Sequence, residues 1–305
     1  MSDSSAVKLP GASELGTTIS MHTSFGGGKK KHRGATQEVI ESKGVTNRKR
    51  VSVQVDLFAA SPHLDSAKKM AQALRNHINS QTLPWGDDGR RFVPNSIKVE
   101  LDNYARKEIA AIDEEMEKHF SSYLDQKKLW ESEGGGLAKT GIEFPSEAVG
   151  RSKYSIELVP GIVTSADDIR VGGLSGDQRK RFIEDVRAAE SSRIQGTVRN
   201  VAERVEDVLT RMVDRMGAYG KDENGKVQGK FHNTIVGNVR EIAGLLDHFN
   251  ITGDPEIENV RRRLVNEICV VTPEQLREDE GLRKDIQNKA NDILSRVGMI
   301  GSKKD

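Results

Sequence analysis

The sequence has a single cysteine and no long apolar run, and both absences exclude classes of protein. Cys269 has no second cysteine to pair with, so an internal disulfide and a cysteine-based zinc site are excluded. No apolar run approaches the roughly 20 residues that a membrane helix needs. The first 25 residues also lack the apolar core of a secretory signal. We therefore expect a soluble, intracellular protein without membrane contact.

Catalytic spacings are missing as well. The seven histidines are scattered, and no two of them lie three or four residues apart, so no helical zinc motif exists. The Gly-x-Ser-x-Gly turn of serine hydrolases is also absent. The acidic pairs Asp87-Asp88 and Asp167-Asp168 are the remaining candidates for a divalent cation, although turns favour Asp for backbone reasons alone. We expect no cofactor, and a metal-dependent enzyme is the least favoured of the functions weighed below.

Charge is distributed unevenly along the chain. Residues 1–50 hold nine Lys/Arg against four Asp/Glu, a net charge of +5, whereas the whole chain carries +1. This segment opens with Ser, Gly and Thr and has little apolar surface to offset the entropy lost on ordering, which predicts a flexible basic arm. Such an arm neutralises phosphates without reading base sequence. The candidate nucleic-acid-binding residues are Lys29, Lys30, Lys31, Arg33, Arg48, Lys49 and Arg50.

The glycine-lysine run at 26–31 is not an ATP-binding loop. Thr23 stands where that loop needs its first glycine, and Lys30 takes the place of the Ser/Thr that holds magnesium. The alternatives that remain are cations on a flexible tether and an ordinary solvated basic tail.

The body of the chain reads as long helices around a short irregular middle. Apolar spacing near 3.6 residues predicts helices at about 63–79, 96–131, 176–217, 231–250, from 255, from 273 and 280–297. Alternating residues predict strands at 51–58 and 153–159, with a further one at 168–171. The expected fold is mainly α, an elongated helical bundle or coiled-coil-like body with a small β element. We divide it into 1–50, 51–175 and 176–300.

The strongest pattern lies in the helix predicted over 176–217. Its apolar residues step by alternating fours and threes, which is the heptad spacing of a coiled coil. A helix of this length, roughly 60 Å at 1.5 Å per residue, cannot bury such a stripe alone, so we expect it to pair with another helix or another chain. The residues of this interaction seam are Ile194, Val198, Val201, Val205, Val208 and Met212.

The segment 82–94 predicts an ordered turn, because it concentrates proline, glycine and aspartate. Trp85, Asp88 and Arg91 are its expected structural residues. Thr82-Leu83-Pro84-Trp85 followed by Asp88-Gly89-x-Arg91 resembles a stretch in uncharacterised proteins of bacteriophages and prophages. Phe144-Pro145-Ser146 and the turn at 250–255 extend the similarity. The resemblance implies a phage protein in the host cytoplasm and a MoxR-type ATPase as a partner, and it transfers no catalytic residues to this chain.

Three functions remain open at this point. The first is a non-enzymatic helical interaction protein that self-associates or acts as an adaptor in a phage assembly, as the seam and the missing catalytic spacings suggest. The second is a nucleic-acid-binding protein that uses its basic N-terminal arm without sequence specificity. The third is a metal-dependent enzyme built on one of the aspartate pairs.

Overall fold

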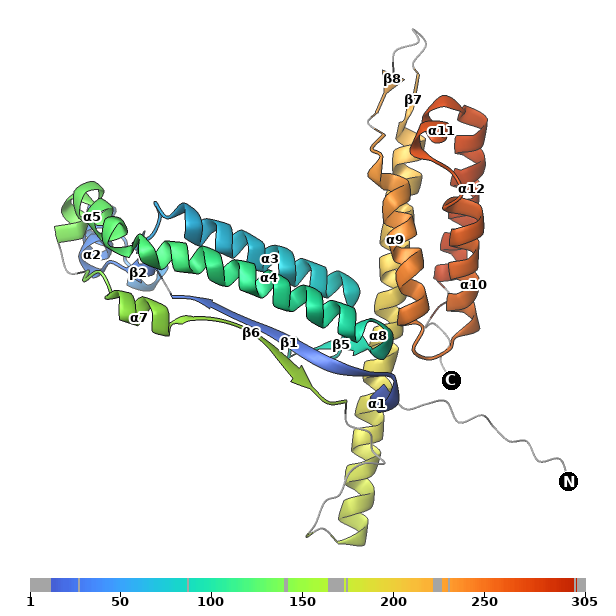
Figure 1. The fold of residues 1–305 in the computed structure, drawn as a ribbon, viewed down its shortest axis with the longest axis horizontal. Coiled ribbons are helices and arrows are strands. Elements are labelled where there is room, and N and C mark those ends of the chain that lie inside the picture. Colours follow the sequence, from blue (N-terminus) through green and yellow to red (C-terminus); the bar gives the residue numbers. More distant parts are fainter. Residues whose placement is uncertain are drawn as a thin grey trace, which may run out of the picture. The chain divides into compact units, whose positions relative to one another are not determined.

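The computed structural model describes residues 12–26, 28–86, 88–139, 142–163, 173, 175–221, 227–229, 231–298 and 300. This part of the chain is mostly helical with a small antiparallel sheet (Figure 1), so the mainly α prediction is confirmed. An elongated, coiled-coil-like body stays a prediction. No helix in the described ranges is both long and apolar enough to cross a membrane.

The chain divides into two compact units whose segments alternate along the sequence. Unit 1 comprises Met1–Ile19, Gln81–Val99 and Pro160–Asp305, and unit 2 comprises Ser20–Ser80 and Glu100–Val159. This division differs from the expected boundaries at residues 50 and 175. Strand pairing joins segments that are far apart in sequence, and such pairing is not visible in local composition.

Unit 1 is built mainly from helices. Their bounds are α1 Ala12–Leu15, α8 Gly176–Ala218, α9 Thr234–Phe249, α10 Pro255–Arg263, a π-helical turn at Leu264–Ile268, α11 Pro273–Glu278 and α12 Glu280–Val297. The starts follow capping chemistry: Asp254 caps α10 with Pro255 as its first residue, and Ser175 forms a capping box with Gln178 on α8. The short strands β7, Gly220–Lys221, and β8, Val227–Gln228, pair after α8.

The heptad seam lies inside unit 1. Helix α8 packs along α12 and α9 (Figure 1). The side chains of Val201, Val205 and Met212 are each about 1% exposed, and Ile194, Val198 and Val208 pack half-buried at the edge of the same core. The seam therefore does find apolar partners, and α9 and α12 of its own chain supply them. Residues 176–193 of α8 lie beyond this core and are mostly exposed.

A four-stranded sheet has the order β4-β5-β1-β6. Its strands are β1 Gly16–Phe25, β4 Leu83–Pro84, β5 Arg91–Pro94 and β6 Tyr154–Gly161. The strand expected at 153–159 is thus present as β6, and it lies next to β1. Antiparallel pairing of β1 with β5 sets Gly16 opposite Pro94 and Ile19 opposite Arg91. The strand expected at 168–171 lies outside the described residues.

Unit 2 holds most of the remaining elements. They are β2 Lys29–Lys31, α2 Arg33–Ser42, a 3-10 turn η1 Arg48–Arg50, β3 Gln54–Asp56, α3 Pro62–Gln81, α4 Asn95–Ser121, α5 Tyr123–Glu133, α6 Gly135–Lys139 and α7 Glu147–Ser152. The start of α4, residues 95–99, and the last residue of α3, Gln81, belong to unit 1. Helices α3 and α4 run antiparallel: the start of α3 contacts the end of α4, and His77 stacks on Tyr104. Phe58, His119, Tyr123 and Phe144 form an aromatic core.

The helix expected over 96–131 is two helices, because the chain breaks at Ser122. Its hydroxyl donates to the carbonyl of His119, so a side chain competes with the helical hydrogen-bond ladder at this point. The apolar stripe nevertheless continues across the break, and Met116, Phe120 and Tyr123 are all buried.

The N-terminal segment also differs from the expected arm. Residues 16–25 form β1, in which Thr18 and Ile19 are buried, and 29–42 form β2 and α2. Composition predicted disorder because the segment has few apolar residues, but its backbone groups pair with strands that lie much later in the chain. Pairing of this kind offsets the ordering cost without a local apolar stripe.

Candidate functional site

Exposed cations gather on three segments of unit 2. They lie on β2, at the first residue of α2 and on η1, and we call them the basic platform: Lys29, Lys31, Arg33, Arg48, Lys49 and Arg50. Lys30, the seventh predicted residue, is not part of it. This side chain is half-buried, and its ammonium donates to the carbonyl of Glu143 at 2.9 Å.

Strand pairing decides which lysines face solvent. Strand β2 pairs antiparallel with β3, with Lys29 opposite Asp56 and Lys31 opposite Gln54. Because side chains alternate between the two faces of a strand, Lys29 and Lys31 share one face while Lys30 lies on the other with buried Val55. The glycine-lysine run therefore presents two of its three cations together.

Hydrogen bonds from main-chain amides join the segments of the platform. The amide of His32 donates to the carbonyl of Val53 at 2.9 Å, and the amide of Val53 donates to the Thr36 hydroxyl at 3.0 Å. Three residues before Val53, η1 ends at Arg50. The arginines of η1 thus lie within a few residues of the β2–β3 pairs, and Figure 1 shows α2 beside β2.

Local chemistry fixes the ends of each segment. The imidazole of His32 accepts from the amide of Ala35 at 2.9 Å and caps α2, while the Asn47 side chain accepts from the amide of Lys49 and caps η1. Gly28 precedes β2, and a Cβ there would lie 2.6 Å from the Phe58 ring. Only glycine fits at this position without a shift of the aromatic core.

The platform carries uncompensated positive charge. None of its six cations is ion-paired with a carboxylate of the described residues. By contrast, most exposed cations on α4, α10 and α12 have such partners, including Lys118, Arg262 and Lys284. Solvated cations in one place are the usual electrostatic footprint of a polyanion site.

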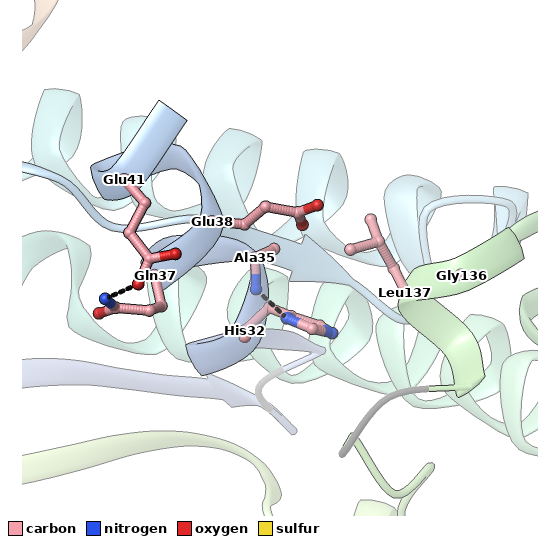
Figure 2. Close-up of a pocket in the computed structure, with 8 residues that line it drawn as sticks. His32, Ala35, Gln37, Glu38, Glu41, Gly136 and Leu137 are labelled. Atoms are coloured by element: carbon pink, nitrogen blue, oxygen red, sulfur yellow. Dashed lines mark hydrogen bonds between the residues drawn. The ribbon is translucent and has the colours of Figure 1, made fainter. Parts of the chain in front are cut away.

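A cavity of about 600 Å³ lies on the side of α2 (Figure 2). Its lining consists of His32, Gly34, Ala35, Gln37, Glu38, Glu41, Gly136 and Leu137. Glu38 and Glu41 give it negative charge, and the Gln37 amide donates to the carboxylate of Glu41. The basic platform and this cavity therefore carry charge of opposite sign.

The predicted loop residues have structural contacts in unit 1. The Trp85 and Phe92 rings lie 5.0 Å apart, and both side chains are buried. Asp88 accepts from Arg90, and this hydrogen bond holds the pKa of the Asp88 carboxyl below its usual value. The ordered turn expected over 82–94 is thus present as the β4–β5 hairpin. Asp87 lies outside the described residues.

Arg91 shares a carbonyl with a residue that the sequence did not single out. The guanidinium groups of Arg91 and Arg204 each donate to the carbonyl of Thr82 at 2.7 Å. Burial, followed by the nearby charge of Arg204, lowers the pKa of Arg91 to about 10. Arg204 lies on α8 between two seam positions, and no local signal distinguished it from the other arginines of that helix.

No metal site is found among the described residues, since no three His, Cys, Asp or Glu side chains in these ranges come together as ligands. The pair Asp167-Asp168, like Asp87, falls outside them. Comparisons with protein-family models, curated proteins and solved structures give no match. The resemblance to a phage family, and the host cytoplasm that it implies, stay predictions.

Proposed function

We propose that this protein binds the phosphate backbone of nucleic acid through the basic platform, without reading base sequence. The observation that carries the proposal is six exposed cations on β2, α2 and η1 that have no carboxylate partner among the described residues. Lysine and arginine bind phosphate chains by releasing condensed counterions, and this term supplies most of non-specific affinity.

The platform offers few amide side chains for reading adenine. Asparagine and glutamine are the side chains best suited to read adenine, and the Asn47 oxygen is engaged in capping η1. Within the described residues of the β2–β3 pair, Gln54 is the one exposed amide side chain on the face that Lys29 and Lys31 share, and it lies opposite Lys31. Non-specific complexes of this kind have dissociation constants of about 10⁻⁴–10⁻⁶ M at physiological salt.

The test compares two triple variants with a charge-matched control. The variants are Lys29→Ala/Lys31→Ala/Arg33→Ala and Arg48→Ala/Lys49→Ala/Arg50→Ala. The control is Lys69→Ala/Lys107→Ala/Lys153→Ala, which removes three exposed lysines of unit 2 outside the platform. Fluorescence anisotropy with labelled duplex and single-stranded DNA reports binding. Equal weakening by all three proteins would mean that only net charge matters, and the platform proposal would then be wrong.

A second candidate is a non-enzymatic interaction protein that self-associates or serves as an adaptor. The heptad seam no longer argues for it, because α9 and α12 cover that face. The observation in its favour is an apolar group on the exposed N-terminal part of α8, residues 176–193, which we call the outer half of α8. There Phe182 is 41% exposed beside half-buried Ile183 and Val186. A phage assembly and a MoxR-type ATPase as partner are supported by the resemblance alone.

Solution mass tests this second candidate. Self-association through the outer half of α8 requires a light-scattering mass above 33.7 kDa that returns to the monomer value in Phe182→Glu. A monomer at every concentration, for both proteins, would contradict self-association.

A further inference from the structure

A cavity of about 370 Å³ in unit 1 contains a serine-histidine pair. It lies where the first turn of α4 meets the last turn of α9, and its lining consists of Glu14, Leu15, Pro94, Asn95, Ser96, Asp247, His248, Asn250 and Ile251. The Asn95 amide donates to the carbonyl of Glu14 at 2.9 Å and joins two sides of the cavity.

The two side chains have the geometry of a nucleophile and its base. Nδ1 of His248 lies 2.9 Å from Oγ of Ser96. With the proton on Nε2, the imidazole accepts the serine hydroxyl hydrogen at Nδ1. Serine is a weak nucleophile by itself and is activated by an adjacent base of this kind. Ser96 is exposed and His248 is half-buried, so a ligand in the cavity reaches both.

A second serine-histidine pair has similar geometry but is closed to ligands. In unit 2, Oγ of Ser61 lies 2.8 Å from Nδ1 of His119, yet the exposed fractions of these residues are 0% and 2%. The Ser61 hydroxyl also accepts from the amide of Leu64 at the start of α3. That pair is a buried cap and meets no ligand, whereas Ser96 and His248 line a cavity.

The first turn of α4 supports the same chemistry. Ser96 is the second residue of a 27-residue helix, and the first N–H groups of a helix have no acceptor within it. Such amides stabilise an oxyanion that develops on a carbonyl attacked beside them. Glu14 gives the cavity negative charge, and Asp247 adds to it although it also lies 4.0 Å from the guanidinium of Arg261. This charge favours a neutral or cationic ligand over an anionic one.

We propose that Ser96, with His248 as its base, hydrolyses small, uncharged or cationic carboxylic esters in this cavity. Oγ of Ser96 attacks the carbonyl carbon while its proton passes to Nδ1 of His248. The carbon–oxygen bond to the leaving alcohol then breaks, and the alcohol takes that proton. Water attacks the acyl-serine next, with His248 as base again, and releases the acid. The net reaction is ester plus water to acid plus alcohol, and it is independent of nucleic-acid binding.

The test uses the full chain, a fluorophosphonate probe and p-nitrophenyl acetate. Peptide mapping by mass spectrometry is expected to find the phosphonate on Ser96 and not on Ser61. His248→Gln is expected to lower both the labelling rate and ester turnover by about 10²-fold, the usual contribution of a general base. Thermal unfolding shows whether that variant is folded.

Ser295→Ala is the matched control, because Ser295 is exposed on α12 of the same unit without a histidine partner among the described residues. It is expected to label and turn over like the unsubstituted chain. The proposal is overturned by any of three results: no adduct on Ser96, unchanged labelling in His248→Gln, or unchanged ester turnover in Ser96→Ala.

Discussion

The salt dependence of nucleic-acid binding gives the sharpest test of the basic platform. Each phosphate neutralised on duplex DNA contributes about −0.9 to the slope of log K against log salt. If all six platform cations contact phosphates, the slope is about −5.4, and affinity falls roughly 2,000-fold between 50 and 200 mM salt. The structure limits the number of phosphate contacts to six, and so limits the slope, because the ammonium of Lys30 is already bonded to the carbonyl of Glu143 and is not counted.

Removing half of the platform halves the slope. For Lys29→Ala/Lys31→Ala/Arg33→Ala we expect about −2.7, which corresponds to a loss of only about 40-fold over the same salt range. The variant on η1 is expected to behave alike, since it also removes three cations. Both effects are best read by anisotropy titrations of one labelled duplex at four or more salt concentrations.

The control decides between a located site and net charge. Lys69, Lys107 and Lys153 lie on α3, on α4 and just before β6, away from the platform segments. The slope of their triple variant is expected to stay near the value of the unsubstituted chain. If that slope drops by about as much as in the platform variants, the reasoning from a fixed platform is refuted. A slope near zero in the unsubstituted chain would remove phosphate binding altogether.

Two further predictions concern unit 2. Gly28→Ala places a Cβ 2.6 Å from the Phe58 ring, so we expect the free energy of unfolding to fall by about 1–3 kcal/mol. Urea denaturation measures this loss. Unchanged stability would show that the aromatic core shifts to accommodate the methyl group. Burial, with the charges of Lys68 and His63, lowers the pKa of His119 to about 4. This value is below the pKa near 6.5 of an unfolded histidine. The contribution of neutral His119 to the unfolding free energy is therefore fully present above pH 6.5 and is lost as the pH falls towards 4. The loss is about 3 kcal/mol, and His119→Gln is expected to flatten that part of the pH profile, whereas an unaltered profile would assign the loss to other groups.

Local patterns predicted the helices well because their signals are local. The last helix was expected at 280–297 and occupies those residues, and the helix expected from 255 begins at Pro255. The break at Ser122 was missed because a serine beside an uninterrupted apolar stripe is compatible with a continuous helix. Only its hydrogen bond to the carbonyl of His119 shows the competition.

The heptad seam shows what a periodic pattern does and does not encode. Alternating steps of four and three predicted a face that must be covered, and that face is covered. The spacing carries no information on which helix covers it. Residues of α9 and α12 have their own apolar stripes and lie in the same chain, so one sequence pattern fits an internal bundle and an oligomer equally.

The candidate sites depended on pairing between distant residues. Ser96 and His248 are 152 positions apart, and neither belongs to a local motif, so spacing rules passed over both. The cations at 29–33 and 48–50 were found from charge alone, but their shared placement depends on β2 pairing with β3. Charge can be counted from a sequence, whereas its position on a surface cannot.

A fixed platform and a flexible arm require different experiments. An arm can be deleted, and loss of binding in a chain without residues 1–50 would then be informative. Here that deletion removes β1, which lies between β5 and β6 in the sheet, and β2, the pairing partner of β3. The truncated chain would lose two sets of backbone hydrogen bonds and expose buried neighbours such as Phe92 and Val55, so lost binding would not separate a missing contact from an unfolded protein. Substitution of exposed side chains leaves the backbone pairs intact, and therefore only point variants assign binding to the platform.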